Sequence, residues 1–185
     1  MQWTLPGTVL SFPAEEADNI EKQFQNMFLG GGLVLSQVAG ITGLEPYTIQ
    51  NWVKRGFLTN PVQKRYSLRQ LCRIININML KAALPMEEIC GLLSYINGDL
   101  SDESDDLIDD ASLYFLFVHL AVNHRKMNTP QGRDEYMEQV LSRYPELSPE
   151  AKHRIEQVLR IMLTAWAASQ LRQHAENMVK ELKNS

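Results

Sequence analysis

The sequence predicts an all-α protein with a helix-turn-helix head and a helical tail. Three observations support this fold class. Between residues 33 and 58 two short helical patterns flank a glycine turn. From residue 107 to 126 the chain is apolar on more than one face of a helix, as in a buried helix. From Ser148 to Lys183 a helix could run without interruption, because no Gly or Pro follows Pro149.

The second helix of the head has clear start and stop signals. Pro46 suits the first position of a helix, where its missing N–H has no intrahelical partner. Gly56 follows at the place where a left-handed residue commonly ends a helix. At about 100° per residue, Ile49, Trp52 and Val53 fall on one face and should pack inward. Helix, tight turn and helix is the arrangement that presents a recognition helix to the DNA major groove.

The other face of this helix carries side chains of the kinds that contact base edges and phosphates. It is formed by Tyr47, Thr48, Gln50, Asn51, Lys54 and Arg55. We expect Tyr47, Gln50 and Asn51 to read bases, and Lys54 and Arg55 to hold phosphates. Lys64 and Arg65, a short distance along the chain, are further candidates for phosphate contacts. The alternative is an ordinary solvated helix.

Charge is sorted along the chain in a way that favours DNA. Residues 33–81 contain seven cations and one acid, a net charge of +6, whereas the whole chain carries −4. The cations are Lys54, Arg55, Lys64, Arg65, Arg69, Arg73 and Lys81. A basic segment in an acidic chain indicates a surface for a polyanion.

The order and spacing of these residues resemble a known family. The segments Val38–Leu44, Thr48–Ile49, Trp52–Leu58 and Lys64–Ser67 look like the head of a MerR-type winged helix-turn-helix protein. That resemblance covers about residues 33–97. It implies a wing after the recognition helix, two further helices and a dimerisation helix. The closest likeness is to a poorly characterised bacterial family that joins such a head to an all-helical tail, which implies a regulator of transcription.

Two departures from the family pattern concern the DNA contacts. Gln50 stands where the family usually has Arg, and the wing is reduced to Val62-Gln63-Lys64-Arg65. At most a minimal β wing is therefore expected. The Trp52–Gly56 run also resembles the excisionase-like branch of the superfamily, whose members are architectural DNA-binding proteins.

Composition divides the chain into four predicted segments. Residues 1–32 form a helical lead segment that should pack on the body, and residues 33–98 form the DNA-binding head. Residues 99–106 are an acidic linker without Lys or Arg. It lacks the ligand spacing and central Gly of an EF-hand loop, and its carboxylates suit the N-terminus of the next helix. Residues 107–185 form the helical tail.

The long C-terminal helix indicates a homodimer. Ile155, Leu159, Met162 and Trp166 follow 4-3-4 spacing, and Leu171, Ala175, Met178 and Leu182 resume that spacing after a phase shift. A helix of this length rarely buries its whole stripe within a small monomer. Two-fold pairing also suits heads that bind paired half-sites. The alternative is that the first half packs within its own tail and the second half frays.

The sequence gives no sign of catalysis, of a metal or of a cofactor. His119 and His124 lie five residues apart, whereas helical metal pairs usually need three or four. Cys72 and Cys90 form no CxxC pair and are read as small buried residues. No apolar run is long enough for a membrane helix and no secretory signal is found, so cytoplasm is expected.

Taken together, the sequence predicts a sequence-specific DNA-binding regulator of transcription that acts as a homodimer on double-stranded DNA. No effector is indicated. The alternative from another class is a protein-interaction module, in which the head's groove or the long helix binds a protein and DNA binding has been lost. Gln50 and the short wing favour that alternative, and the basic segment opposes it.

Overall fold

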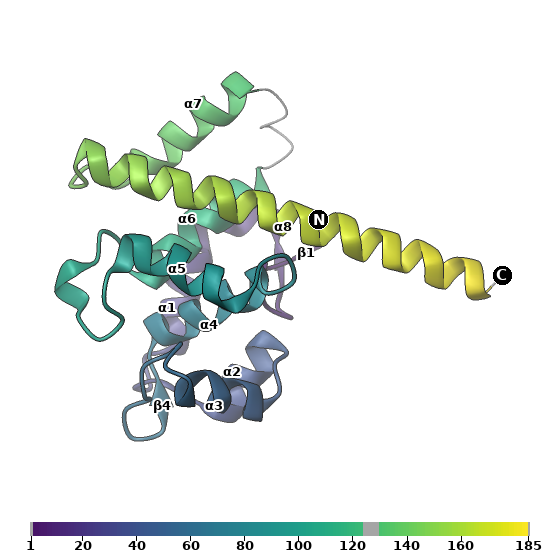
Figure 1. Ribbon diagram of the computed structural model, residues 1–185, viewed down its shortest axis with the longest axis horizontal. Coiled ribbons are helices and arrows are strands. Elements are labelled where there is room, and N and C mark those ends of the chain that lie inside the picture. The colour runs from purple at the N-terminus through teal and green to yellow at the C-terminus, as the bar shows by residue number, and fades with distance from the viewer. Residues whose placement is uncertain (1, 124–129, 185) are drawn as a thin grey trace.

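The computed structural model describes residues 2–123 and 130–184, and helices predominate in it (Figure 1). The helices are η1 (Ala14–Asn19, 3-10), α1 (Ile20–Met27), α2 (Leu35–Thr42), α3 (Pro46–Lys54), α4 (Leu68–Leu80), α5 (Met86–Asn97), η2 (Glu103–Asp105, 3-10), α6 (Asp110–Val122), α7 (Pro130–Leu141) and α8 (Pro149–Asn184). Four short strands form two antiparallel pairs, β1 (Gln2–Thr4) with β2 (Ser11–Pro13) and β3 (Leu33–Val34) with β4 (Arg65–Tyr66). The predominantly helical class is confirmed.

Helix α4 lies at the centre of the molecule and is buried on nearly all sides. It begins at a capping box, in which Ser67 Oγ accepts from the Gln70 N–H and Gln70 Oε1 accepts from the Ser67 N–H. Nine of its thirteen residues are buried, and it contacts α2, α5, α6 and α8. Figure 1 shows α2 and α3 on one side of α4 and α6 to α8 on the other. Head and tail are therefore packed on one shared helix.

A buried ion pair joins α4 to the start of α6. Arg73 Nη1 lies 3.4 Å from both carboxylate oxygens of Asp110, and the Asp110 side chain is completely buried. Arg73 Nε also donates to the carbonyl oxygen of Phe57, just after α3. Burial raises the pKa of Asp110, whereas Arg73 and Arg69 oppose that rise. Arg73 thus contacts both the segment after α3 and the first turn of α6.

The first 32 residues pack on the body, as predicted. The β-hairpin that they contain was not predicted. Ile20 and Phe24 of α1 are buried, and Phe24 meets Phe115 of α6 edge to face. The turn between β1 and β2 is held by Tyr114 Oη, which donates to Pro6 O. Strands of three residues give too short an alternation to be recognised in a sequence.

Helix α6 is the buried core helix of the tail, as predicted, although it begins at Asp110 rather than at residue 107. Its start is fixed by Asp109, whose Oδ1 accepts from the backbone N–H groups of Ala111 and Ser112. This cap is therefore supplied by Asp109, which lies just beyond the predicted acidic linker of residues 99–106. His124 and Lys126 lie outside the described residues.

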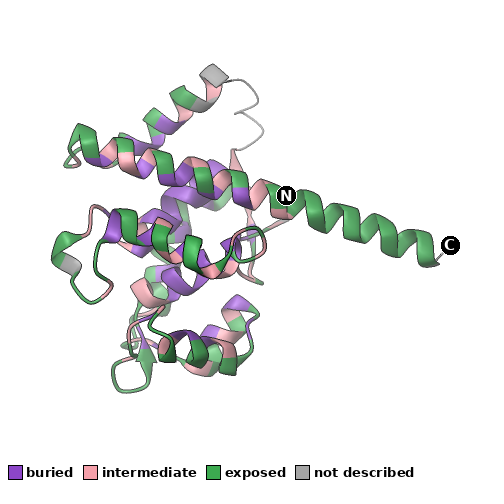
Figure 2. Cartoon of the chain, viewed as in Figure 1, coloured by how far each residue is buried: buried purple, intermediate pink, exposed green. Residues whose placement is uncertain are grey.

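Helix α8 runs over 36 residues, which matches the predicted length, but its predicted pairing stripe is wrong in its first half. Ile155, Leu159 and Met162 are completely buried in the core of their own chain. Trp166 packs edge to face on Phe117, with ring centroids 6.0 Å apart. The buried and exposed faces in Figure 2 show that α8 lies on the body over its first half only. The 4-3-4 spacing of these four residues therefore reflects an intramolecular contact.

The ion pair between Arg73 and Asp110 gives a test of how head and tail are joined. Asp110→Ala leaves a buried guanidinium without its carboxylate, so the free energy of unfolding should fall by about 3–5 kcal/mol in urea denaturation. Exchange of both residues, Arg73→Met with Asp110→Leu, removes both charges and should cost clearly less. Equal losses in the two variants would contradict a dominant role for the unpaired charge.

Candidate nucleic-acid interface

The exposed face of α3 is set by signals at its two ends. Pro46 occupies the first turn of α3, after a turn from α2 in which Gly43 has a left-handed φ of 70°. Gly56 has a φ of 77° and ends the helical segment, as predicted. Ile49 and Trp52 are buried and Val53 is half-buried. The inward face of α3 is therefore confirmed.

The predicted contact residues lie on the outward face of α3 and on the following hairpin. Tyr47 is 70% exposed, and Thr48 is half-buried near the start of the helix. The remaining candidates are all exposed: Gln50, Asn51, Lys54, Arg55, Lys64 and Arg65. Seven of the eight side chains are thus accessible to a partner without any movement of the backbone.

The segment after α3 forms a short hairpin with a strained turn. Val62 and Arg65 are bridged, and the Arg65 N–H donates to Val62 O over 2.9 Å. The two residues between them, Gln63 and Lys64, have φ values of 50° and 62°. Two successive positive φ angles are typical of a type I′ turn, which Asn and Gly prefer. The hairpin therefore holds Lys64 at its tip at a cost in backbone strain.

A cleft of about 400 Å³ separates α3 from this hairpin. Gln50 from α3 and Lys64 from the hairpin lie at the cleft, so the structure brings together two candidates that are 14 positions apart. Its other walls are Leu35, Val53, Pro61 and Tyr66. Sequence reasoning missed these apolar walls, because their proximity depends on the antiparallel pairing of β3 with β4.

Two of the predicted phosphate contacts also have partners within the chain. The Arg55 guanidinium lies 4.6 Å from the centroid of the Phe57 ring, a cation–π distance. Arg65 Nη1 donates to Gly32 O over 2.9 Å, which ties the hairpin to the segment before β3. These contacts restrict both side chains while leaving them exposed.

Fewer of the seven cations in residues 33–81 are exposed than the net charge of that segment implied. Arg73 is buried against Asp110, and Arg69 lies 2.5 Å from Asp106 of the acidic segment. Lys81 Nζ lies 5.7 Å from the centroid of the Trp52 ring, and burial lowers the pKa of Lys81. The acidic segment predicted as a solvated linker therefore contacts the head through Asp106. The cations of this segment that remain exposed are those of α3 and of the hairpin, together with Lys81.

A second cavity, of about 660 Å³, lies on the other side of the hairpin. It is bounded by the hairpin, by the first turns of α4 and by Leu100 and Ser101 of the acidic segment. Among its charged lining residues, Arg69 and Arg73 are engaged with Asp110, and Arg65 donates to Gly32 O. It forms the junction between head and tail.

Within residues 2–123 and 130–184, no three His, Cys, Asp or Glu side chains converge as a metal site would require. Burial raises the pKa of Cys72 well above its usual value, which suits an inert buried thiol. Among the helices described, none combines the length and the apolar content needed to cross a bilayer.

Two comparisons with known proteins found a match, and they differ in how much of the chain they cover. A domain of unknown function (DUF1836) matches residues 32–117, from just before β3 into α6. The uncharacterized protein YkrK of Bacillus subtilis (strain 168) is 25% identical over 160 residues, which is 80% of this chain and 69% of its own length. No solved structure matches the chain. The matched domain contains α3, the hairpin and both members of the buried pair, Arg73 and Asp110.

The strained turn predicts that substitution by glycine should stabilise the protein. Lys64→Gly and Gln63→Gly each remove a side chain from a left-handed residue, so each should raise the free energy of unfolding by about 0.5–1 kcal/mol. Urea denaturation of the two variants beside the wild type measures this effect. A loss of stability in both would contradict the left-handed geometry of the turn.

Proposed function

We propose that this protein is a sequence-specific DNA-binding regulator of transcription whose head is a MerR-like winged helix-turn-helix. One observation carries the proposal: the exposed polar face of α3 and the basic tip of the hairpin border the same cleft. Polar side chains on a helix suit base edges in a major groove, and cations on a hairpin suit the neighbouring phosphates.

The shape of the head supports this reading in two further respects. α3 follows α2 after a short turn and presents its polar side outward, which is how a recognition helix enters a groove. The hairpin between Val62 and Arg65 stands beside α3, where a wing would contact the backbone of DNA, and β4 at its end pairs with β3. The Arg65–Gly32 bond would keep the wing at a fixed position relative to α3.

The proposed roles differ between side chains that would read bases and side chains that would hold phosphates. Asn51 and Gln50 can each donate and accept, so both suit adenine, while Tyr47 can contact a base or a phosphate. Lys54, Arg55 and Lys64 carry the charge that draws the head to DNA. Gln50, at the rim of the cleft, would act between the recognition helix and the wing.

Salt dependence is the first test of this function. If these cations contact phosphates, the logarithm of the binding constant should fall linearly with the logarithm of salt concentration, by roughly 0.9 per contact. Fluorescence anisotropy with a duplex selected from a random library measures the slope. Binding that stays equally tight from low to high salt would count against phosphate contacts.

A matched set of variants separates base reading from phosphate binding. Asn51→Ala should flatten the preference at one base position, a change of about 1–3 kcal/mol for a bidentate contact. Lys64→Gly should weaken all duplexes about equally, because a phosphate contact carries no base information. Gln63→Gly is the control, since it makes the same backbone change without the loss of charge. An unchanged site preference in Asn51→Ala would mean that another face of α3 meets the bases.

The alternative is a protein-interaction module, and one observation favours it. Four apolar or aromatic residues line the cleft between α3 and the hairpin, where a peptide side chain could also bind: Leu35, Val53, Pro61 and Tyr66. Failure to select any duplex from the random library would favour this function over DNA binding.

A further inference from the structure

The cavity of about 660 Å³ between the hairpin and the acidic segment has both charged and apolar walls. Its volume falls within the ~300–1,000 Å³ that is usual for small-molecule sites. Three arginines and one aspartate line it, so the net charge of its lining is +2: Arg65, Arg69, Arg73 and Asp110. Half-buried apolar side chains line it as well, among them Phe28, Leu68 and Leu100. We call it the junction cavity.

Arg73 brings an unused hydrogen-bond donor to the junction cavity. Its side chain is only 6% exposed, its Nε donates to Phe57 O over 3.0 Å, and its Nη1 lies 3.4 Å from both oxygens of Asp110. The distance to Asp110 exceeds the ~2.7–2.9 Å of a strong charge-assisted hydrogen bond. Among the residues that the structure describes, Arg73 Nη2 has no hydrogen-bond partner. A ligand that supplied an acceptor to this nitrogen would therefore be stabilised.

The first turn of α4 adds a second anion-binding feature to the junction cavity. Ser67, Leu68, Arg69 and Gln70 all line the cavity. The first N–H groups of a helix have no partner within that helix, and the helix dipole makes this end positive. The capping box uses the N–H groups of Ser67 and Gln70, and the N–H of Leu68 lies between those two positions. Anions commonly bind at helix N-termini for these reasons.

The carboxylates near the junction cavity do not balance its arginines. Asp110 lies within 3.9 Å of both Arg73 and Arg69, and its side chain is completely buried. Arg69 also pairs with Asp106, and Arg65 donates to the neutral carbonyl oxygen of Gly32. Three guanidinium groups thus face two carboxylates, even when Asp106 is counted with the lining residues. The charge that remains favours an anion in the cavity.

We propose that the junction cavity binds a small organic anion, a carboxylate or a phosphate monoester joined to an apolar group. The acidic end would accept hydrogen bonds from Arg73 Nη2 and from the N–H groups at the start of α4. The apolar end would contact Phe28, Leu68 and Leu100. Binding of this ligand does not depend on the proposed DNA binding, because the cleft of Gln50 and Lys64 lies on the other side of the hairpin.

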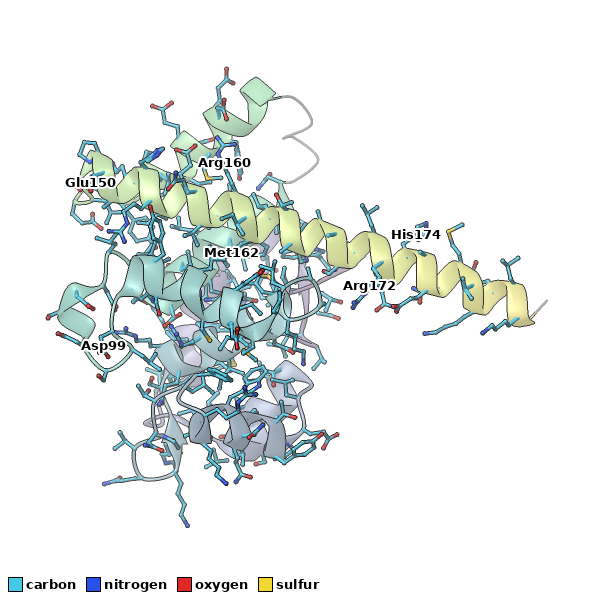
Figure 3. All side chains as sticks on the ribbon, in the orientation of Figure 1. Asp99, Glu150, Arg160, Met162, Arg172 and His174 are labelled. Atoms are coloured by element: carbon cyan, nitrogen blue, oxygen red, sulfur yellow. The ribbon has the colours of Figure 1, made fainter. Side chains whose placement is uncertain are left out.

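The acidic segment offers a matched pair of serines for a test of this site. Ser101 lines the cavity, and its N–H and Oγ both donate to Asp99 Oδ1, over 2.8 Å and 2.6 Å. Figure 3 shows Asp99 in the loop after α5, on the opposite side of the molecule from the C-terminal end of α8. Ser104 makes the same two contacts with Asp102, over 2.9 Å and 2.6 Å, but it lies outside the described lining of the cavity. Both serines are exposed.

Nuclear magnetic resonance titration of the isotope-labelled full chain tests the chemistry of the ligand. The probes are phenyl phosphate, phenylacetate, benzyl alcohol, benzylamine and inorganic phosphate. Phenyl phosphate or phenylacetate should bind with a dissociation constant of about 1 mM or lower, and the tighter of the two identifies the acidic group. The neutral and cationic probes lack the charge and inorganic phosphate lacks the apolar part, so each should bind at least about tenfold more weakly. Absence of binding by both organic anions, or equally tight binding of any other probe, would overturn the proposal.

The same titration locates the site. The largest shifts should occur at the backbone N–H of Leu68 and at the Nε–H of Arg73. Ser101→Glu places a negative charge at the cavity and should raise the dissociation constant of the organic anion by about fivefold or more. Ser104→Glu adds the same charge in the same segment and should change that constant less than about twofold.

Two results would show that the anion binds elsewhere. One is a set of shifts centred on α3, and the other is an equal effect of Ser101→Glu and Ser104→Glu. Neither result would alter the tests of DNA binding, which depend on α3 and the tip of the hairpin, so the two proposals can fail separately.

Discussion

The burial of Arg73 within α4 constrains the arrangement of the whole molecule. Arg73 is only 5% exposed, so its guanidinium requires a carboxylate and hydrogen-bond acceptors close by. Asp110 and Phe57 O supply them. Asp110 starts α6, the core helix of the tail, and Phe57 directly follows the α3 segment. In addition to the apolar core shared by head and tail, this one buried side chain therefore joins the segment after the proposed recognition helix to α6.

This arrangement also decides where positive charge reaches the surface. Arg69 and Arg73 are paired with Asp106 and Asp110, so the exposed cations of residues 33–81 are those of α3 and the hairpin, together with Lys81. The acidic segment thus has a structural role, since it neutralises the side of α4 that faces the tail. An anionic partner would meet a smaller and better defined basic surface than the sequence suggested.

The two halves of α8 differ in burial, because the first half packs on the body and residues 171–183 are exposed. The inner face of α8 is buried in the hydrophobic core as far as Ala165, and Trp166 still packs on Phe117. From Leu171 to Lys183 every residue is exposed. The apolar residues that seemed to change phase in the sequence belong to two different faces of the helix.

The sequence by itself determined the helical class, the ends of α3 and α4 and the inward face of α3. These features depend on local signals, such as Pro46, Gly56, the Ser67–Gln70 capping box and apolar residues at helical spacing. The length of α8 was also readable, because no Gly or Pro interrupts it after Pro149.

Contacts between distant segments were decided by the tertiary structure alone. They include the β1–β2 hairpin, the shared cleft of Gln50 and Lys64, the pairing of Arg73 with Asp110 and the burial of Met162. Periodicity tells which residues share a face of a helix, but it does not tell what that face meets. The physical reason is that burial and ion pairing depend on how elements far apart in the chain pack together.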